Sequence, residues 1–346
     1  MSERRAYLDP GLGEDRGVVT LDGRPERFFL RREGDDPRLQ LGARLIARVE
    51  HVEPVLASAF LDLGGVQALL PFKPEARPVR GAAVTVEIRS EPREGKLATL
   101  RALGAGEGAP RLLEPAPTLA DVLQTLVRDG PVATGPEARR VADEAEDEAL
   151  QTIHALPGGG TLAIEPTRAL TAVDVDLGER KGADGKRAAR QANLAALSEA
   201  ARLLRLKGLG GLVVVDLVGR GHDGAALLAA ARHAFGPDNP GVAIGPVGRF
   251  GTMELSIPRR AAPVLERLRR PEGGLTDAAL AHRLVRRLEA EGVAQPGARL
   301  EARCAPDVAA AAESLGVRLA ERIGARFAIV GEPGRRRADF DVGSAG

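Results

Sequence analysis

Hydrophobic and polar residues alternate in short runs between residues 38 and 103. The runs are ARLIARVEHV, LASAFLDLG, VQALLPF, AAVTVEIRSEP and KLATLRAL, and Gly, Pro or charged residues separate them. Alternation with a period of two is typical of β-strands that bury one face. About five short strands in so compact a stretch predict a small closed barrel of the oligonucleotide-binding (OB) type. The Gly- and Pro-rich residues 102–118 predict a linker after the barrel.

The pattern becomes helical at residues 119–155. This stretch contains an acidic run formed by Asp143, Glu144, Glu146, Asp147 and Glu148. A charge run usually forms a solvated helix face, so we expect these carboxylates to be exposed rather than to hold a metal.

After residue 160 the pattern predicts strand, strand, helix, strand, helix, strand and strand. The first two strands are TLAIEP and ALTAVDVD, and the helix at 186–206 repeats its apolar residues every three or four positions. GLVVVDLV is an almost continuous apolar run, which predicts a strand covered on both faces. Residues 222–234 predict a second helix, and GVAIGP and GTMELS predict the last strands. Residues 276–331 predict a small separate α+β unit that ends in a polar tail. The fold class is therefore a multidomain mixture of α+β and α/β.

Two of these strands end in aspartate. Asp174 closes ALTAVD, Asp216 closes GLVVVD, and one helix separates them. A right-handed crossover of this length places two strands parallel, and adjacent strands lie ~4.8 Å apart. Two carboxylates at the same strand ends can share one hard divalent cation. Asp176 lies two residues after Asp174 and points to the same face if the strand continues. From the residues alone, aspartates that merely end strands stay an open alternative.

The composition limits which metal ion the protein could bind and through which side chains. The 346 residues suit two or three domains, and 44% are hydrophobic. The single cysteine, Cys304, excludes an internal disulfide and a cysteine-built zinc site, and we expect it to be an ordinary buried residue. The five histidines lack the H-E-x-x-H spacing of zinc hydrolases. A metal would therefore be held by carboxylates, which favours magnesium, with manganese as the alternative.

Charge and aromatic content limit how a nucleic acid could bind. The formal net charge is +1, so local basic patches would have to hold the phosphates. Aromatic residues are 3% of the chain, so base stacking would rest on very few side chains. The amino terminus is charged without an apolar core, and no run reaches the length of a membrane span. We therefore expect a cytoplasmic protein with no membrane partner.

Three segments together resemble a known catalytic core. They are ALTAVDVDLG (169–178), NLAALSEAARLLRLKGLGGLVVVDL (193–217) and RFGTMELS (249–256). In order and spacing they resemble the ribonuclease E/ribonuclease G family. Residues 41–64 resemble the first half of that family's S1-type RNA-binding barrel, and residues 306–329 resemble its small C-terminal domain.

The resemblance implies a metal-dependent endoribonuclease that cuts single-stranded RNA and leaves a 5′-phosphate and a 3′-hydroxyl. Asp174 and Asp216 match the two aspartates that hold magnesium, and Asp176 stands where the family has an asparagine. The resemblance implies four domains: an RNase H-like segment at 1–37 plus 119–158, an S1-type OB barrel at 38–103, a DNase I-like catalytic domain at 159–271, and a small α+β domain at 276–346.

RNA-binding candidates follow from the same resemblance. Phe60 matches an aromatic that stacks on bases, whereas Leu69 replaces the second one. Further candidates are the basic residues of the barrel and of the catalytic segment: Arg48, Lys73, Lys96, Lys181 and Arg249. The basic residues between the two aspartates also suggest phosphate contacts: Arg180, Lys181, Lys186, Arg187, Arg190, Arg202, Arg205 and Lys207. For each of these cations, ordinary surface charge is the alternative.

The sequence departs from the family in two further ways. LRRPEGGLT stands where the family carries a cysteine motif that links two chains through zinc, so no zinc is expected and a homodimer would need another contact. The segment between barrel and catalytic core is too short for the family's 5′-monophosphate sensor, so stimulation by that group should be weak or absent. A non-catalytic RNA-binding protein of the same fold, and a nuclease acting on DNA, are the rival readings.

Overall fold

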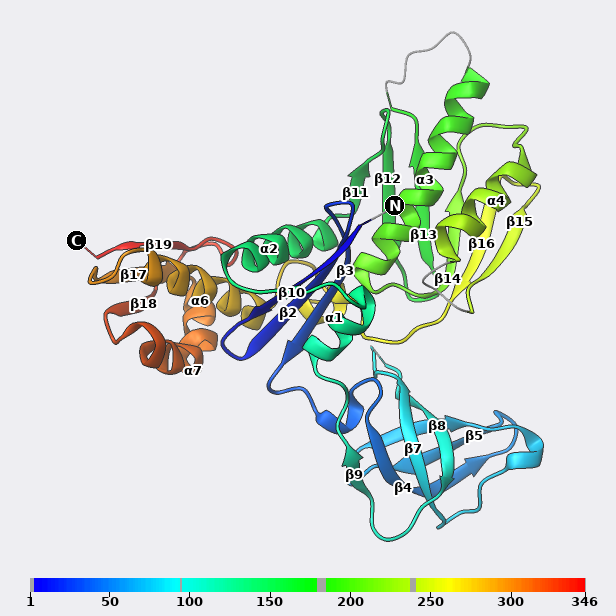
Figure 1. Cartoon of the computed structure of the whole chain (residues 1–346), viewed down its shortest axis with the longest axis horizontal. Helices are drawn as coiled ribbons and strands as arrows, with labels where there is room; N and C mark the ends of the chain where they lie inside the picture. The colour runs from blue at the N-terminus through cyan, green and yellow to red at the C-terminus, as the bar shows by residue number, and fades with distance from the viewer. Residues whose placement is uncertain (1–2, 94, 179–184, 237–240, 346) are drawn as a thin grey trace.

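The computed structural model describes residues 3–93, 95–178, 185–236 and 241–345. The fold is mixed α+β, as expected, and its strands form four sheets. In Figure 1 a barrel projects below the rest of the molecule, a large sheet with two helices stands above it, and a smaller helical unit extends to the left.

The barrel is a closed six-stranded sheet with the order β5-β6-β8-β7-β4-β9, closed by pairing of β5 with β4. Its strands are β4 (Arg44–Glu53), β5 (Ser58–Asp62), β6 (Gln67–Pro71), β7 (Ala83–Ser90), β8 (Ala98–Ala105) and β9 (Arg111–Glu114), with short 3-10 turns η1 (Pro37–Leu39) and η2 (Pro74–Ala76). The predicted linker at 102–118 is wrong in part. Strand β8 extends to Ala105 and β9 pairs with β4, because Leu112 packs against the apolar interior of the barrel.

The barrel is inserted between the elements of a second, four-stranded sheet with the order β10-β1-β2-β3. Its elements are β1 (Arg4–Pro10), β2 (Glu14–Leu21), β3 (Arg24–Arg32), β10 (Val132–Ala133) and the covering helices α1 (Leu119–Val127) and α2 (Pro136–Leu150). Helix α1 begins where the Thr118 side chain accepts from the Asp121 N–H, and Asp121 accepts in return from Thr118. Segments on both sides of the barrel thus form one sheet and its helices.

The expectation of a fully exposed acidic run in α2 is wrong for Glu148, which is half-buried against Arg202, and most clearly for Glu146. Glu146 is only 1% exposed and contacts three guanidinium groups: Arg16 at 2.9 Å, Arg283 at 2.6 Å and Arg286 at 3.1 Å. The run is therefore amphipathic, and its inner side is paired with arginines from β2 and from the C-terminal helix α6 (Asp277–Ala294).

The third sheet has the order β11-β12-β13-β14-β16-β15 and carries the predicted sequence of strands and helices. Its elements are β11 (Ile153–Ala155), β12 (Thr161–Pro166), β13 (Thr171–Asp176), α3 (Gly185–Lys207), β14 (Gly211–Asp216), α4 (Gly224–Phe235), β15 (Ala243–Val247) and β16 (Thr252–Ile257). Helices α3 and α4 lie on one face, against buried side chains such as Val173, Val215 and Leu255 (Figure 1). The prediction that β14 is covered on both faces is wrong, since Leu212 on its other face is 44% exposed.

The C-terminal unit contains the predicted helix, strand, helix and strand. Its elements are α6 (Asp277–Ala294), β17 (Leu300–Cys304), α7 (Pro306–Ile323), β18 (Phe327–Gly331) and β19 (Asp341–Ser344). The short helix α5 (Val264–Leu268) precedes this unit and packs into the core shared by the four- and six-stranded sheets. The polar tail is not all coil, because β19 pairs with β17 and Val342 packs on the apolar interior. Cys304 is fully buried as expected, and burial raises the pKa of its thiol. Within the described ranges, no helix has both the length and the apolar character needed to cross a membrane.

Candidate functional site

The two strand-ending aspartates lie side by side. Strands β13 and β14 are parallel neighbours, and their register pairs Asp174 with Asp216. Both side chains are exposed on the face of the sheet that α3 and α4 leave open. Alternation explains this placement, because the neighbours Val173, Val175 and Val215 point to the buried face. Neither carboxylate has a hydrogen bond or ion pair with another described residue, so both are available to a ligand.

Asp176 lies on the same open face, two residues beyond Asp174. Its Oδ1 accepts a hydrogen bond from the Gly178 N–H at 2.6 Å, which forms a tight turn at the end of β13. Gly160 passes close to this turn, since a Cβ there would meet the Asp176 carbonyl oxygen at 2.3 Å. Asp176 thus shapes the strand end, and its second carboxylate oxygen remains open.

The backbone after Asp216 is held from two sides. Asn193 of α3 is 1% exposed; it donates from Nδ2 to the Val218 carbonyl and accepts from the Val218 N–H, each at 3.0 Å. The Leu217 N–H donates to the Gly251 carbonyl at 3.2 Å, which joins this loop to the tip of the β15–β16 hairpin. These contacts fix the direction in which the Asp216 side chain leaves the sheet.

The two carboxylates fit a hard divalent cation. Magnesium is bound in proteins by one or two carboxylates, with waters and substrate phosphate completing its shell. Asp174 and Asp216 offer two unpaired carboxylates on neighbouring strands. Across the described ranges, no group of three or more His, Cys, Asp or Glu side chains is placed to share a metal ion.

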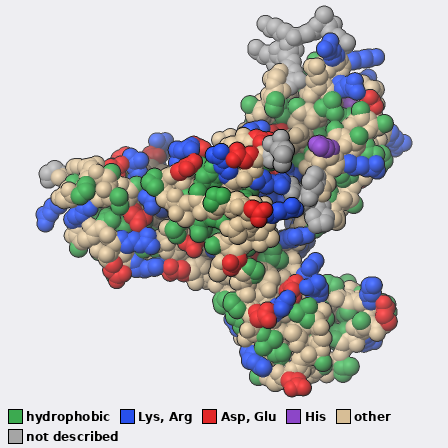
Figure 2. All heavy atoms as spheres, in the orientation of Figure 1, with side chains coloured by type: hydrophobic (Ala, Val, Ile, Leu, Met, Phe, Trp, Pro, Cys, Tyr) green, Lys and Arg blue, Asp and Glu red, His purple; other side chains and the backbone are tan. Residues whose placement is uncertain are grey.

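Basic side chains gather near this strand end, although fewer than the sequence suggests. Lys186, Arg187 and Arg190 are exposed at the start of α3, and Arg190 pairs with Asp223 at 3.3 Å. On the face seen in Figure 2, Lys and Arg side chains are frequent over the α3 and α4 region. Lys181, a candidate RNA contact, lies outside the described residues. Arg249 is exposed at the hairpin tip.

Three of the cations expected to contact phosphate have structural partners instead. Arg202 pairs with Glu148 at 2.6 Å, and Arg205 pairs with Glu26 at 2.8 Å. Lys207 is fully buried and donates to the carbonyl oxygens of residues 149 and 151, while burial lowers the pKa of its amine to about 8. These residues lie in the last turns of α3, at the end away from the aspartates, where the helix packs on the rest of the protein.

The barrel candidates are spread over its surface. Phe60 lies between His51 on β4 and Leu69 on β6, and the centroids of the Phe60 and His51 rings are 6.1 Å apart. Arg48 donates to the carbonyl oxygens of Gly81 at 3.1 Å and Gly108 at 3.2 Å.

The two barrel lysines are separated. Lys73 and Lys96 are both exposed. Lys73 follows the end of β6, whereas Lys96 precedes β8, whose start runs parallel to the start of β6. The two lysines thus lie towards opposite ends of β6 and form no single cluster with Phe60.

The barrel joins the six-stranded sheet at the end away from the aspartates. The Glu91 N–H donates to the Arg260 carbonyl at 2.7 Å, and Glu91 Oε2 accepts from the Ala262 N–H at 3.1 Å. This segment follows β16, whose last residue pairs with the first residue of β14. Asp216 is the last residue of β14, so a full strand of 6 residues separates the two places. At ~3.3 Å per residue, β14 spans roughly 17 Å between the barrel contact and the aspartates.

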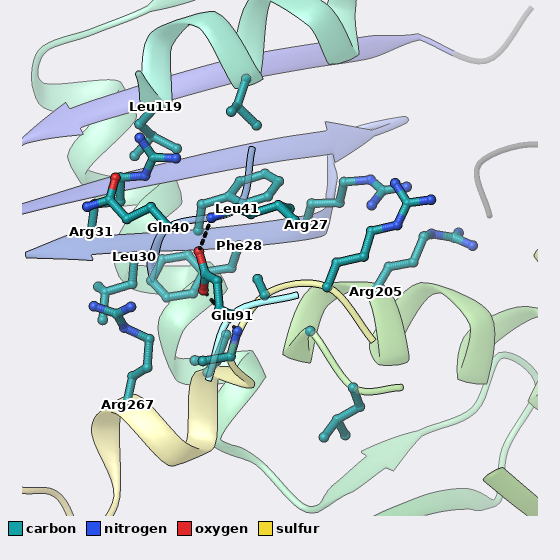
Figure 3. Close-up of a pocket in the computed structure, with 18 of the residues that line it drawn as sticks. Arg27, Phe28, Leu30, Arg31, Gln40, Leu41, Glu91, Leu119, Arg205 and Arg267 are labelled. Atoms are coloured by element: carbon teal, nitrogen blue, oxygen red, sulfur yellow. Dashed lines mark hydrogen bonds between the residues drawn. The ribbon is translucent and has the colours of Figure 1, made fainter. Parts of the chain in front are cut away.

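A cavity of about 420 Å³ lies at this barrel junction and not at the aspartates. Figure 3 shows Glu91 near its centre, with Arg27 and Arg205 on one side and Arg31 and Arg267 on the other. Carboxylates that line the cavity already have partners. Asp35 pairs with Arg267 at 2.6 Å, and Glu91 accepts hydrogen bonds from two backbone N–H groups. The cavity therefore marks the joint between barrel and body, and the exposed sheet face remains the candidate site.

One feature of the site was missed at the sequence level. Phe250 is 77% exposed at the hairpin tip beside the aspartates, and the Arg249 guanidinium lies 4.5 Å from its ring centroid. The segment RFGTMELS contains the signal, because an apolar ring next to arginine and before glycine suggests a turn rather than a buried strand.

Comparison with known proteins gives a consistent set of relatives. Residues 133–260, which include both aspartates and the hairpin, match the model of the Ribonuclease E/G family. The chain is 37% identical to Ribonuclease E of Haemophilus influenzae over 116 residues, which is 33% of this chain and 12% of that protein. It is 36% identical to Ribonuclease E of Escherichia coli over 116 residues, or 33% of this chain and 11% of that protein.

A plant relative extends the set. The chain is 33% identical over 109 residues to the Ribonuclease E/G-like protein, chloroplastic, of Arabidopsis thaliana, which covers 30% of this chain and 11% of the relative. The match thus spans only about a tenth of the length of these relatives. The segment that carries the aspartate pair is thus similar to the ribonuclease E/G family.

Proposed function

We propose that this protein is a magnesium-dependent endoribonuclease that hydrolyses single-stranded RNA to 5′-phosphate and 3′-hydroxyl ends in RNA processing or decay. The observation that carries the proposal is the register of β13 and β14, which sets Asp174 directly opposite Asp216 on an open sheet face. The names of the relatives, Ribonuclease E, support RNA as the substrate.

Asp174 and Asp216 would hold the magnesium ion, for which manganese could substitute. When bound, the cation would polarise the scissile phosphate and lower the pKa of a coordinated water. The exposed position of both carboxylates leaves room for an RNA backbone on the same face. Asp176 would steady the end of β13 through its bond to Gly178 and supply a further acceptor for a water proton.

The remaining elements would deliver the RNA. Arg249 at the hairpin tip and the cations at the start of α3 would contact phosphates around the cut, and so would Lys181, which precedes this helix in the sequence. We further infer that the closed barrel is an S1-type RNA-binding module, with Phe60 as its stacking ring and Arg48, Lys73 and Lys96 as its surface charges. The four-stranded sheet with α1 and α2 would be RNase H-like, and the six-stranded sheet with α3 and α4 would be DNase I-like.

The test is cleavage of a 5′-labelled, AU-rich single-stranded oligonucleotide with magnesium, with EDTA, and with the 2′-deoxy equivalent. Wild type should cut the RNA only with metal, whereas Asp174→Asn and Asp216→Asn should each lose at least a hundredfold in rate. Asp129→Asn, an exposed aspartate in the turn after α1, is the matched control and should cut like wild type.

A gel shift of the same RNA without metal separates the outcomes. RNA binding without cleavage would replace the proposal with a non-catalytic RNA-binding protein. Cutting that is unaffected by both asparagine variants would place the chemistry elsewhere. Products carrying a 3′-phosphate would contradict hydrolysis with a water nucleophile.

A further inference from the structure

The exposed ring of Phe250 has no structural explanation in the fold. The chain has eight phenylalanines and one tyrosine, and Phe250 is the one aromatic side chain that is exposed among the described residues, which include all nine. An exposed ring of this size gains nothing from the hydrophobic interior and leaves apolar area in water. Rings in such positions commonly serve recognition, because they offer a flat apolar face to a partner.

The hairpin tip puts this ring next to the aspartates. Thr252, the first residue of β16, pairs with Asp216, and the turn that precedes it contains Phe250. The Gly251 N–H donates to the Gly248 carbonyl at 3.0 Å, and the Gly248 N–H donates to the Thr252 carbonyl at 2.8 Å. Gly251 has φ +85°, a conformation that favours glycine. The turn is therefore closed by its own backbone and tied to the loop after Asp216.

The Arg249 guanidinium lies over one face of the Phe250 ring. The guanidinium carbon lies 4.5 Å from the centroid of Phe250, which is the geometry of a cation–π contact. A guanidinium on one face leaves the opposite face of the ring for another flat group. No described carboxylate forms an ion pair with Arg249, so its charge remains available to a phosphate next to the stacked group.

We propose that Phe250 is a nucleobase-stacking platform for a nucleotide adjacent to the scissile phosphate, with Arg249 holding the phosphate beside that base. This inference rests on the proposed ribonuclease function and names a subsite of the same site. Stacking is tolerant of base identity, so the platform sets the position of the strand over the aspartates rather than its sequence. The barrel that carries Phe60 joins the sheet at the end away from Asp216, whereas Phe250 lies in the turn next to Asp216.

The test uses binding and cleavage on the same set of oligonucleotides. A short single-stranded RNA is prepared intact and with one abasic position at each site around the cut. Affinity is measured by fluorescence anisotropy without metal, and single-turnover cleavage is measured with magnesium. The variants are Phe250→Ala, Phe250→Tyr and, as the control, Val317→Ala, an exposed apolar side chain on α7 that is 66% exposed.

Loss of the platform should raise the dissociation constant of the intact RNA about tenfold, in the range measured for one stacked base. Phe250→Tyr should restore binding, because the ring is retained, and Val317→Ala should bind like wild type. One abasic position next to the cut should weaken wild-type binding about tenfold and should not weaken binding by Phe250→Ala further. A purely structural role for Phe250 would instead give additive losses at every abasic position.

The two readouts separate this inference from the proposed function. Abasic coupling in binding, without any cleavage by wild type, would support the platform and overturn the ribonuclease proposal. Cleavage that depends on Asp174 and Asp216, with equal affinity and equal cleavage for wild type and Phe250→Ala, would overturn the platform alone. Coupling that maps to a position remote from the cut would also overturn it.

Discussion

Replacing Glu146 by glutamine should destabilise the protein strongly. Its carboxylate is almost fully buried and contacts the guanidinium groups of Arg16, Arg283 and Arg286 at 2.6–3.1 Å. Although burial opposes ionisation, these three cations hold the pKa of Glu146 at about 2, against an ordinary value of 4.5. A shift of this size corresponds to about 3 kcal/mol of folding free energy at neutral pH, at ~1.4 kcal/mol for each unit.

The loss of folding free energy should be about 3 kcal/mol and not larger, because each of the three arginines has a second carboxylate partner. After Glu146→Gln, Arg16 would keep Asp9, Arg283 would keep Asp147 and Arg286 would keep Glu14, so no guanidinium would be left without a carboxylate. Removing one partner of a fully isolated buried pair typically costs ~3–5 kcal/mol. We therefore expect Glu146→Gln to lower the free energy of unfolding by about 3 kcal/mol.

Urea unfolding followed by circular dichroism at a series of pH values measures this loss. The folded-state pKa of Glu146 is depressed, so its contribution is complete above pH 4.5 and disappears as the pH falls towards 2. The difference between wild type and Glu146→Gln should therefore shrink over that window. Glu144→Gln is the matched control, because Glu144 pairs only with Arg140 on the exposed side of α2 and should cost under ~0.5 kcal/mol. A difference below 1 kcal/mol at pH 7, or one that persists unchanged down to pH 3, would refute this reasoning.

Three further substitutions test other parts of the account. Glu91→Ala removes the acceptor of the Ala262 N–H, so the barrel should move more freely on the body, seen as faster amide exchange at the barrel junction with an unchanged melting temperature of the core. Asn193→Ala leaves the Val218 N–H and carbonyl without their partners, which should cost about 2 kcal/mol of stability and slow RNA cleavage more than it weakens RNA binding. Lys207→Met removes a buried ammonium whose pKa is lowered, so wild type but not the variant should gain stability as the pH rises from about 8 to 10, measured by thermal unfolding.

The six-stranded sheet that carries the aspartates could be predicted from sequence because its pattern is local. Alternation and the strand-ending aspartates at 174 and 216 predict the strands and their parallel arrangement, but not the open face. The sequence does not predict strand β9 of the barrel. The apolar pattern around Leu112 is too short to distinguish a strand from a linker. The prediction that both faces of β14 are buried is wrong, because an apolar run such as GLVVVDLV does not show whether one face of a strand is buried or both.

Long-range ion pairs were the least predictable feature. Glu146 looks like any member of an acidic run, and only tertiary structure brings Arg286, 140 residues away, to its carboxylate. In the same way, Arg202 and Lys207 look like phosphate contacts in sequence but have buried partners in the fold. The charge pattern therefore locates the basic segment. It does not distinguish the arginines and lysines that have partners inside the fold from those that are exposed.

The most direct measurement is the magnesium dependence of RNA cleavage by wild type, Asp174→Asn and Asp216→Asn under single-turnover conditions. The paired register predicts that each asparagine variant loses at least a hundredfold in rate and needs a higher magnesium concentration for half-maximal cleavage. RNA affinity without metal should be unchanged in both variants. Cleavage at the wild-type rate, with an unchanged magnesium midpoint in either variant, would contradict the claim that these two carboxylates form the catalytic metal site.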